Sequence, residues 1–394
     1  MPAQAGPQLA EAAAISLRSR NVVSEAFFAR ESDRLALACR EMSERFLGGG
    51  RLLAFGRGPC ATDAQHVSVE FVHPVIVGKR ALPALDLSMA FADWAPAICR
   101  PGDIAMGFAP AAGDSEVSTV LDRLRRMGAH TFALTGGNAD FSLDSPSSDP
   151  FIHQEVIEVL YHTLWETVHV FFEHHELGHD VGNAGFLYPY LGRKKQDTAA
   201  VMEGVAESIR SKAAEVAGLR EQVARDEAGA ISAAATAILE RIRAGGKIIT
   251  IGNGGSATDA TDMALDCVSP PSGYRPLPAV SLALEPANIT AIANDIGADA
   301  IFLRQLIALA APEDVLVVFS TSGGSANIMS AIVESRKRGL AVVALLGYDG
   351  GEILRRGLVD FPIVVRSDYI PRIQEVHASI YHVMRDLLET CANG

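Results

Sequence analysis

The chain has 394 residues, a formal net charge of −13 and five cysteines without CxxC spacing, and its pI is near 5.3. This length is sufficient for two domains, the acidic balance argues against a nucleic-acid scaffold, and the cysteines indicate neither a disulfide framework nor a cysteine zinc site. No basic segment with an apolar core opens the chain and no run could span a bilayer, so we expect a cytoplasmic protein with neither membrane nor nucleic-acid partners.

Short apolar runs alternate with longer helical patterns along the chain, which predicts parallel sheets with helices on both faces. A long helical stretch precedes the first strand. The predicted strands are 51–55, 81–86, 104–108 and 131–135, then 247–251, 279–284, 315–319, 341–346 and 361–365. Between the third and fourth strand of each half, a helix with a basic last turn ends at a glycine, Gly128 or Gly339.

The two halves of the chain are copies of one another. The segment 49–70 reappears as 245–266, and the shared ATDA run begins at Ala61 and at Ala257, an offset of 196 (257 − 61). A constant offset over a strand, a glycine-rich turn and a helix start indicates a duplicated domain. We therefore predict two α/β domains, 1–177 and 197–394, joined by a linker at 178–196.

The offset grows along the chain. It is 211 between Asp103 and Asp314, so the first copy lacks fifteen residues (211 − 196) that the second copy has before that point. It is 220 between Gln154 and Gln374, a further nine (220 − 211). Segments that follow strand ends in an open α/β sheet contact ligands. The first copy is therefore expected to hold substrate poorly.

The second copy has the pattern of an anion site. An apolar run leads to Ser-Thr-Ser-Gly-Gly-Ser at 320–325, followed by a helix, so hydroxyls and free backbone N–H groups gather at the positive end of the helix dipole. A second turn of small residues, 252–256, follows the first strand in the same way. Each turn alone is also consistent with ordinary turn and cap residues. Two such turns at one sheet edge favour a phosphate site.

The first copy has the pattern of a metal site. His66 and Glu70 are four apart on one predicted helix, and Gln154 and His162 are eight apart on another. Two helices that each offer two ligands can close a four-coordinate site, for which Zn²⁺ is the default ion. The alternative is a solvated His/Glu pair and a buried histidine.

Four motifs in order, GNGGSATDA, ANDIG, STSGGSANIMSAI and RIQEVHASIYH, resemble the sugar isomerase (SIS) domain of bacterial phosphoheptose isomerases. These enzymes interconvert sedoheptulose 7-phosphate and a heptose 7-phosphate. The resemblance covers nearly all of the second copy and, more weakly, the first. It implies tandem SIS domains, each a flavodoxin-like parallel sheet with helices on both faces, association through helices, and active sites at subunit interfaces.

The resemblance also implies site residues. The phosphate loop falls on Ser320, Thr321, Ser322 and Ser325, the small-residue turn on Asn253, Gly254, Gly255 and Ser256, and the sugar-contacting pair on Asn294 and Asp295. The family's metal ligands are matched in the first copy by His66, Glu70, Gln154 and His162, and in the second copy the corresponding residues are Asp262, Asp266, Gln374 and His382. The aspartates would suit Mg²⁺ or Mn²⁺ better than Zn²⁺, or leave that position vacant.

The first copy departs from the phosphate loop. It reads Ala-Pro-Ala-Ala-Gly-Asp at 109–114, which lacks the hydroxyls, loses one N–H at proline and places a carboxylate where an anion would bind. We therefore expect no phosphate binding there.

The economical hypothesis is that the two copies pack as a pseudo-dimer in which the first supplies zinc and the second the phosphate cradle. Isomerisation would pass through an enediolate, with Glu70 moving the proton between C1 and C2 and His162 acting as an acid. Asp266 and His382 are the competing acid–base pair if the second copy acts alone. In a third version of the hypothesis, the first copy is a structural partner whose metal only stabilises the fold. Two chains would give a homodimer with four SIS domains, and no nucleotide is expected.

Two alternatives to a phosphosugar isomerase are considered. A non-catalytic regulatory or assembly protein that binds a sugar phosphate would use the same loops without turnover. The run His175-Glu176-Leu177-Gly178-His179 fits the HExxH pattern of zinc metallopeptidases. Gly178 stands where a ligand helix should continue, and the stretch is locally rich in histidine, so we interpret this match as a coincidence.

Overall fold

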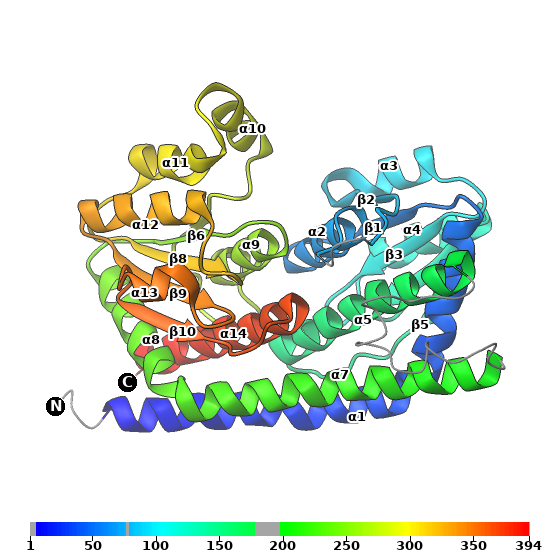
Figure 1. Ribbon diagram of the computed structural model, residues 1–394, viewed down its shortest axis with the longest axis horizontal. Coiled ribbons are helices and arrows are strands. Elements are labelled where there is room, and N and C mark those ends of the chain that lie inside the picture. The colour runs from blue at the N-terminus through cyan, green and yellow to red at the C-terminus, as the bar shows by residue number, and fades with distance from the viewer. Residues whose placement is uncertain (1–4, 76–78, 178–197, 394) are drawn as a thin grey trace. The chain divides into compact units, whose positions relative to one another are not determined.

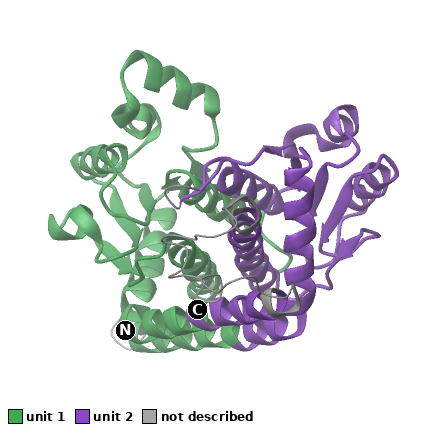
Figure 2. Cartoon of the chain, turned by 45° about the vertical axis from the view of Figure 1, so that its right-hand side comes forward, with its two compact units in different colours: residues 1–21, 216–394 green, residues 22–215 purple. Residues whose placement is uncertain are grey.

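The computed structural model in Figure 1 describes residues 5–75, 79–177 and 198–393. The chain forms two compact units, which Figure 2 shows in different colours. Unit 1 comprises Met1–Asn21 and Val216–Gly394 and carries the second copy; unit 2 comprises Val22–Glu215 and carries the first copy. The predicted linker 178–196 lies outside the described residues.

Two long helices contribute residues to both units. Helix α1 (Ala5–Leu47) passes from unit 1 to unit 2 after Asn21, and α7 (Thr198–Asp226) passes back after Glu215. Within unit 1, Arg18 Nε donates to Glu221 Oε2 over 2.7 Å. Within unit 2, Arg210 Nη1 donates to Ser32 Oγ over 2.7 Å. Each unit therefore includes a segment of both helices, which the simple two-segment division of the sequence does not anticipate.

Unit 2 contains a parallel five-stranded sheet with the order β2-β1-β3-β4-β5. Its elements are β1 (Leu52–Phe55), α2 (Pro59–Val72), β2 (Ala84–Asp86), η1 (Ser88–Ala90), α3 (Phe91–Ile98), β3 (Ile104–Phe108), α4 (Ser115–Arg126), β4 (His130–Leu134), β5 (Phe141–Ser142) and α5 (Pro150–Leu177). All four predicted strands are present. The fifth, with two residues, is too short to be found from periodicity.

Unit 1 repeats this sheet with the order β10-β9-β8-β6-β7, again entirely parallel. Its elements after α7 are α8 (Ala228–Arg243), β6 (Ile248–Ile251), α9 (Gly255–Val268), β7 (Ala279–Ser281), α10 (Pro286–Asp295), η3 (Ala298–Ala300), α11 (Ile301–Leu309), β8 (Val315–Ser320), α12 (Ala326–Arg338), β9 (Ala341–Leu346), α13 (Gly351–Arg355), β10 (Phe361–Val364) and α14 (Ile370–Asn393). The five predicted strands are confirmed. Unit 1 has α10 and α11 between its second and third strands, where unit 2 has α3 alone besides a short 3₁₀ turn.

The duplication extends to backbone conformation. Gly58 precedes α2 with φ 58° and ψ −133°, and Gly254 precedes α9 with φ 57° and ψ −127°. A positive φ of this kind favours glycine. The two turns that follow the first strands therefore share one conformation.

Alternating residues along the buried strands pack against the helices that cover each face. In unit 1 one core cluster joins Leu316 and Val318 of β8 to Ile328 and Ile332 of α12, and all four are fully buried.

In each sheet the first strand lies between the second and the third strand. The chain therefore runs from the first strand to its neighbour on one side and then returns to its neighbour on the other side. Ligands of open α/β sheets bind where the strand order reverses in this way. Among the described residues, no helix has the length and apolar character to cross a membrane.

Candidate active site

Two turns meet at the point in unit 1 where the strand order reverses. Asn253 follows β6, and Asn327 lies in the first turn of α12 after the neighbouring strand β8. Each side-chain amide donates to the carbonyl oxygen of the other, over 3.0 Å and 2.8 Å. The predicted small-residue turn is thereby joined to the predicted phosphate loop.

The predicted phosphate loop leads from β8 into the N-terminus of α12. Ser320 is buried, and its hydroxyl accepts a hydrogen bond from the backbone N–H of Gly323 over 3.1 Å. Ser322 is exposed, and Ser325 immediately precedes the helix without making a side-chain capping bond within the described residues. Thr321 is half-buried beside them. The loop therefore presents hydroxyl groups at a helix N-terminus, where an oxyanion is stabilised.

The predicted turn residues lie at the corresponding end of α9. Gly254 has φ 57°, Gly255 is the first helical residue, and Ser256 is buried within the first turn. Gly252 comes so close to the start of the helix that a Cβ atom would stand 2.0 Å from the carbonyl oxygen of Ser256. Only glycine fits this approach, which brings the helix N-terminus close to the strand end.

Asn294 and Asp295 occupy the end of α10 and are both exposed. Asn294 Nδ2 donates to Asp295 Oδ1 over 2.8 Å. Within the described part of the chain, the structure records no hydrogen bond from this pair to the two turns. Their predicted contact with the sugar stays a prediction.

Three titratable side chains gather between α9 and α14 in unit 1. Asp262 and Asp266 lie one turn apart on α9, and His382 comes from α14. His382 Nε2 lies 3.2 Å from Asp266 Oδ2 and 3.9 Å from Asp262 Oδ2. All three are buried, and one donor atom of each lies within 4.8 Å of the others. The Tyr381 hydroxyl donates to Asp262 Oδ2.

This group has the oxygen-rich donor set that the sequence predicts for the second copy. Gln374 lies two turns before His382 on α14, is buried, and its carboxamide oxygen has no hydrogen-bond partner among the described residues. The two carboxylates and the imidazole fit a divalent ion of the Mg²⁺ or Mn²⁺ type. The same Asp266–His382 contact also fits an acid–base pair.

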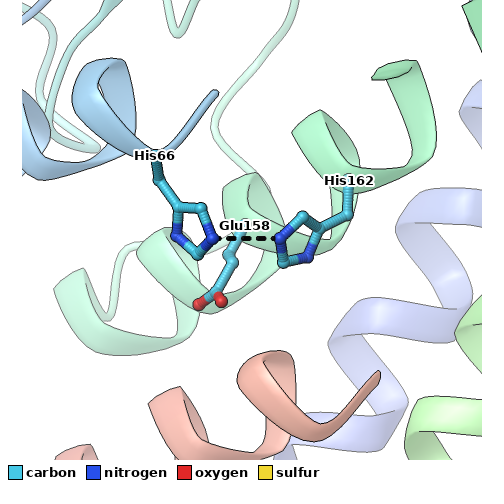
Figure 3. A group of neighbouring side chains, drawn as sticks. All are labelled: His66, Glu158 and His162. Carbon is cyan, nitrogen blue, oxygen red and sulfur yellow. Dashed lines mark hydrogen bonds between the residues drawn. The ribbon is translucent and has the colours of Figure 1, made fainter. Parts of the chain in front are cut away.

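Unit 2 has the corresponding group at the same place in its fold. Figure 3 shows His66 of α2 facing Glu158 and His162 of α5. The two Nε2 atoms lie 3.3 Å apart, and one donor atom from each of the three side chains lies within 4.8 Å of the others. The Tyr161 hydroxyl is 2.9 Å from His66 Nδ1. Burial, with a smaller contribution from His162, holds the pKa of His66 well below its usual value, so this imidazole is neutral.

The three side chains whose donor atoms come together do not include Glu70, which the sequence analysis names as a ligand. Glu70 Oε1 lies 3.8 Å from His66 Nε2. Gln154 is only half-buried on α5. Glu158 was missed in the sequence, although its spacing of four from His162 is the same helical signal that identified His66 and Glu70.

In unit 2 the loop 109–114, which corresponds to the predicted phosphate loop of unit 1, ends with a carboxylate that caps the following helix. Asp114 precedes α4, and its Oδ1 accepts from the backbone N–H groups of Glu116 and Val117 over 2.8 Å and 3.0 Å. These N–H groups are the donors that a bound phosphate would use. The arrangement supports the prediction that this loop holds no phosphate.

The HExxH match extends beyond the described residues. Helix α5 ends at Leu177, while Gly178 and His179 lie outside the described residues, as do the side chains of His175 and Glu176. The interpretation of the motif as a coincidence stays a prediction.

The chain is similar in sequence to known proteins that contain the SIS domain. A family model described as the SIS domain matches residues 213–347. The phosphoheptose isomerase of Pelobacter propionicus is 40% identical over 190 residues, which are 48% of this chain and 97% of that protein. The enzyme of the same name from Geobacter sulfurreducens is 44% identical over 170 residues, which are 43% of this chain and 89% of that protein.

Solved structures match the chain over both units. The C-terminal domain of glucosamine-fructose-6-phosphate aminotransferase from Francisella tularensis has a TM-score of 0.58 at 11% identity and covers 95% of this chain and 96% of its own. The tagatose-6-phosphate ketose/aldose isomerase from Escherichia coli has a TM-score of 0.51 at 13% identity and covers 96% and 93%. These matches show the tandem α/β fold alone. With a relative that is 40% identical over nearly its whole length, the chain belongs to the SIS-domain family that includes the phosphoheptose isomerases.

Proposed function

We propose that the chain isomerises sedoheptulose 7-phosphate to a heptose 7-phosphate and that the reaction takes place in unit 1. The names of its relatives support a phosphoheptose substrate. The observation that carries the proposal is the hydrogen-bonded pair Asp266–His382, whose helix α9 begins at the turn that Asn253 joins to the phosphate loop. A binding region for an anion and an acid–base pair are thus built on the same elements.

The phosphate group is bound by the loop between β8 and α12. Ser322 and Ser325 donate hydroxyl hydrogen bonds, and the N-terminus of α12 supplies backbone N–H groups and a favourable dipole. Because this end of the substrate does not react, its binding energy serves to hold C1 and C2 in position.

The reaction exchanges one proton between neighbouring carbons. The Asp266 carboxylate takes the proton from the hydroxyl-bearing C1 of the ketose, which gives an enediolate, and returns it to C2. His382 donates a proton to the C2 oxygen and accepts one from the C1 oxygen, so both groups finish in their initial protonation states. A positioned acid–base pair contributes about 10²- to 10⁴-fold to the rate.

A divalent ion is compatible with this group of side chains. Asp262, Asp266 and His382 would hold it, in which case Asp266 and His382 would be its ligands in place of their acid–base role, and it would polarise the substrate oxygens. Tyr381 orients the group, since its hydroxyl donates to Asp262 while its ring packs against Phe319 of β8, with centroids 5.7 Å apart. Zinc in unit 2, homo-oligomerisation and a cytoplasmic location stay predictions.

The decisive experiment measures conversion of sedoheptulose 7-phosphate by the wild type, Asp266→Asn, Ser322→Ala and His66→Ala. We expect Asp266→Asn to abolish turnover, Ser322→Ala to weaken substrate binding, and His66→Ala to retain turnover. Abolition by His66→Ala in a folded chain would instead support catalytic zinc in unit 2, as in the sequence hypothesis. Binding of the substrate without any conversion by the wild type would make the chain a regulatory binder and refute the isomerase proposal.

A further inference from the structure

We infer that the segment 347–353, the turn after β9 with the first residues of the short helix α13, positions the backbone of the proposed phosphate loop, and that Gly351 is its central positioning residue. The two segments are in backbone contact. A Cβ atom on Gly351 would lie 2.3 Å from the carbonyl oxygen of Ser322. One on Gly323 would lie 2.3 Å from the carbonyl oxygen of Gly350. The inference rests on the function proposed above, because it assigns this bracing segment a role in binding the phosphate end of the substrate.

Three successive carbonyl groups of the loop, those of residues 321–323, face the bracing segment. The carbonyl oxygen of Gly323 accepts a hydrogen bond from the backbone N–H of Ile353 over 2.9 Å. The carbonyl oxygen of Thr321 lies 2.6 Å from the position of a Cβ atom on Gly347. In a trans peptide the N–H group points opposite to the C=O group. These peptides therefore direct their N–H groups away from the bracing segment, as a backbone anion site requires.

Two of these N–H groups also orient the hydroxyl groups of the loop. The backbone N–H of Gly323 donates to Ser320 Oγ over 3.1 Å. The backbone N–H of Gly324 donates to Ser322 Oγ over 3.4 Å. A serine hydroxyl that accepts a hydrogen bond can still donate its own hydrogen. Fixing the loop backbone therefore also fixes two hydroxyl groups that can donate to a phosphate.

The bracing segment has a backbone conformation that few residues adopt. Gly350 and Gly351 have φ of 86° and 59°, and Tyr348 has φ 51° although it is not a glycine. Such a conformation persists at a tyrosine only where the surrounding structure holds it. The backbone N–H of Gly350 donates to the Gly347 carbonyl over 2.9 Å, and that of Gly351 donates to a carboxylate oxygen of Asp349 over 3.0 Å. The segment is thus fixed by its own hydrogen bonds and can support the loop.

Unit 2 has a shorter connection at the place of α13. In unit 2 Phe132 of β4 pairs with Phe141 of β5. In unit 1 the corresponding pair is Val343 of β9 and Phe361 of β10, at offsets of 211 (343 − 132) and 220 (361 − 141). The nine residues (220 − 211) that the first copy lacks therefore fall between these two strands, where unit 1 has its bracing segment.

The shorter connection does not support its neighbouring loop in the same way. A Cβ atom on Gly136, which corresponds to Gly347 at the offset of 211, would meet no heavy atom of the described residues within 4 Å. The neighbouring loop 109–114 has no serine or threonine. The bracing segment and the hydroxyl-bearing loop are therefore both present in unit 1, and the described part of unit 2 has neither.

The test compares Gly351→Ala with the matched control Gly357→Ala. The two glycines have nearly the same left-handed φ, 59° and 57°, but a Cβ atom on Gly357 would meet no heavy atom of the described residues within 4 Å. Both substitutions should lower the thermal midpoint, whereas only Gly351→Ala displaces the loop. We expect Gly351→Ala to raise KM for sedoheptulose 7-phosphate by about 10-fold or more with a smaller change in kcat, and Gly357→Ala to keep the KM of the wild type.

Hydrogen exchange tests the support of the loop directly. In the ligand-free proteins, the backbone N–H groups of 321–324 should exchange faster by about 10-fold or more in Gly351→Ala than in the wild type and in Gly357→Ala. In the wild type, saturating sedoheptulose 7-phosphate should slow exchange of the Ile353 N–H, because ordering the loop fixes the Gly323 carbonyl to which it donates. This last measurement needs no variant.

The outcomes separate this inference from the isomerase proposal. A folded Gly351→Ala with the KM and the loop exchange of the wild type, or an Ile353 N–H whose exchange is unchanged by bound substrate, would overturn the inference while the isomerase proposal stands. Binding without conversion by the wild type would refute the isomerase proposal alone, and the affinities of the variants, measured by calorimetry, would then replace KM. Exchange in the ligand-free proteins tests the bracing segment even if the chain binds no sugar phosphate.

Discussion

The side-chain amides of Asn253 and Asn327 exchange two hydrogen bonds, with Asn253 Nδ2 donating to Asn327 Oδ1 over 3.0 Å and Asn327 Nδ2 donating to Asn253 Oδ1 over 2.8 Å. Asn327 Oδ1 also accepts from the backbone N–H of Ile328 over 2.9 Å. The pair fixes the turn after β6 against the first turn of α12. It thus determines the distance between the proposed phosphate loop and the helix that carries Asp266.

The amide pair should be energetically coupled. We expect Asn253→Ala and Asn327→Ala each to reduce the free energy of unfolding, and the double variant to lose about 1 kcal/mol less than the sum of the two, because the second change finds its partner already removed. Urea unfolding of the four proteins measures this coupling. Additive losses would mean that the two amides do not interact in solution.

The phosphate loop should act through binding. We expect Ser322→Ala to raise KM for the sugar phosphate by about 10- to 100-fold, since a hydrogen bond to a charged group contributes about 1.5–3 kcal/mol. Its kcat should change less, because the phosphate does not react. Ser330→Ala, farther along α12, is the matched control and should behave as wild type. A lower kcat at unchanged KM would place Ser322 at the reacting carbons instead.

The acid–base pair should act through the rate. We expect His382→Ala to lower kcat by about 10²- to 10⁴-fold while the affinity for the sugar phosphate, measured by calorimetry, stays close to that of the wild type. Thr390→Ala, which lies near the exposed end of the same helix, controls for effects on α14. An active His382→Ala enzyme would exclude this histidine from catalysis.

The fold was predictable from the sequence because its signals are local and strong. Buried runs such as 341–346 and glycine stops such as Gly339 gave strand and helix positions within a few residues. The two-residue strand Phe141–Ser142 has no period to detect. The passage of α1 from one unit to the other depends on packing between distant segments, which no local pattern reports.

The candidate site residues could be predicted where two polar side chains stand four residues apart on one helix. The His66/Glu70 and Asp262/Asp266 spacings identified the helix faces that the structure brings to His162 and His382. Glu158 has the same spacing of four from His162, but the family pattern has its ligand eight residues before the histidine, at Gln154, and so does not include Glu158. Asn327 and Tyr381 could not be assigned in this way, since their roles depend on contacts 74 and 119 residues away along the chain.

The altered loop of unit 2 should contribute to stability and not to catalysis. We expect Asp114→Ala to cost about 1 kcal/mol, because the backbone N–H groups of Glu116 and Val117 lose their capping acceptor. Turnover should be unchanged. Asp122→Ala, on the exposed face of the same helix, should lose less than about 0.5 kcal/mol. A marked loss of turnover in Asp114→Ala would show that the loop takes part in the reaction.

The ion pair of Asp103 should make the stability of unit 2 depend on pH. Burial raises the pKa of this carboxyl group, but the hydrogen bonds from the Arg51 side chain and from the backbone N–H groups of Arg100 and Arg51 outweigh it, so the pKa is lowered from its ordinary value of 3.8. Arg51 Nη2 donates to Asp103 Oδ2 over 2.7 Å, and Arg51 N donates to Oδ1 over 3.0 Å.

Because the pKa of Asp103 is lower in the folded chain than in the unfolded one, its carboxylate stabilises the fold above the ordinary pKa and loses that contribution as the pH falls through the folded value. We expect Asp103→Asn to unfold at a lower temperature than the wild type at pH 7, and the difference to shrink as the pH is lowered below about 4. Calorimetric scans between pH 7 and pH 3 measure this, with the exposed Asp122→Asn as the control. A difference that stays constant over the whole range would mean that the charge of Asp103 contributes nothing and that the variant acts through packing alone.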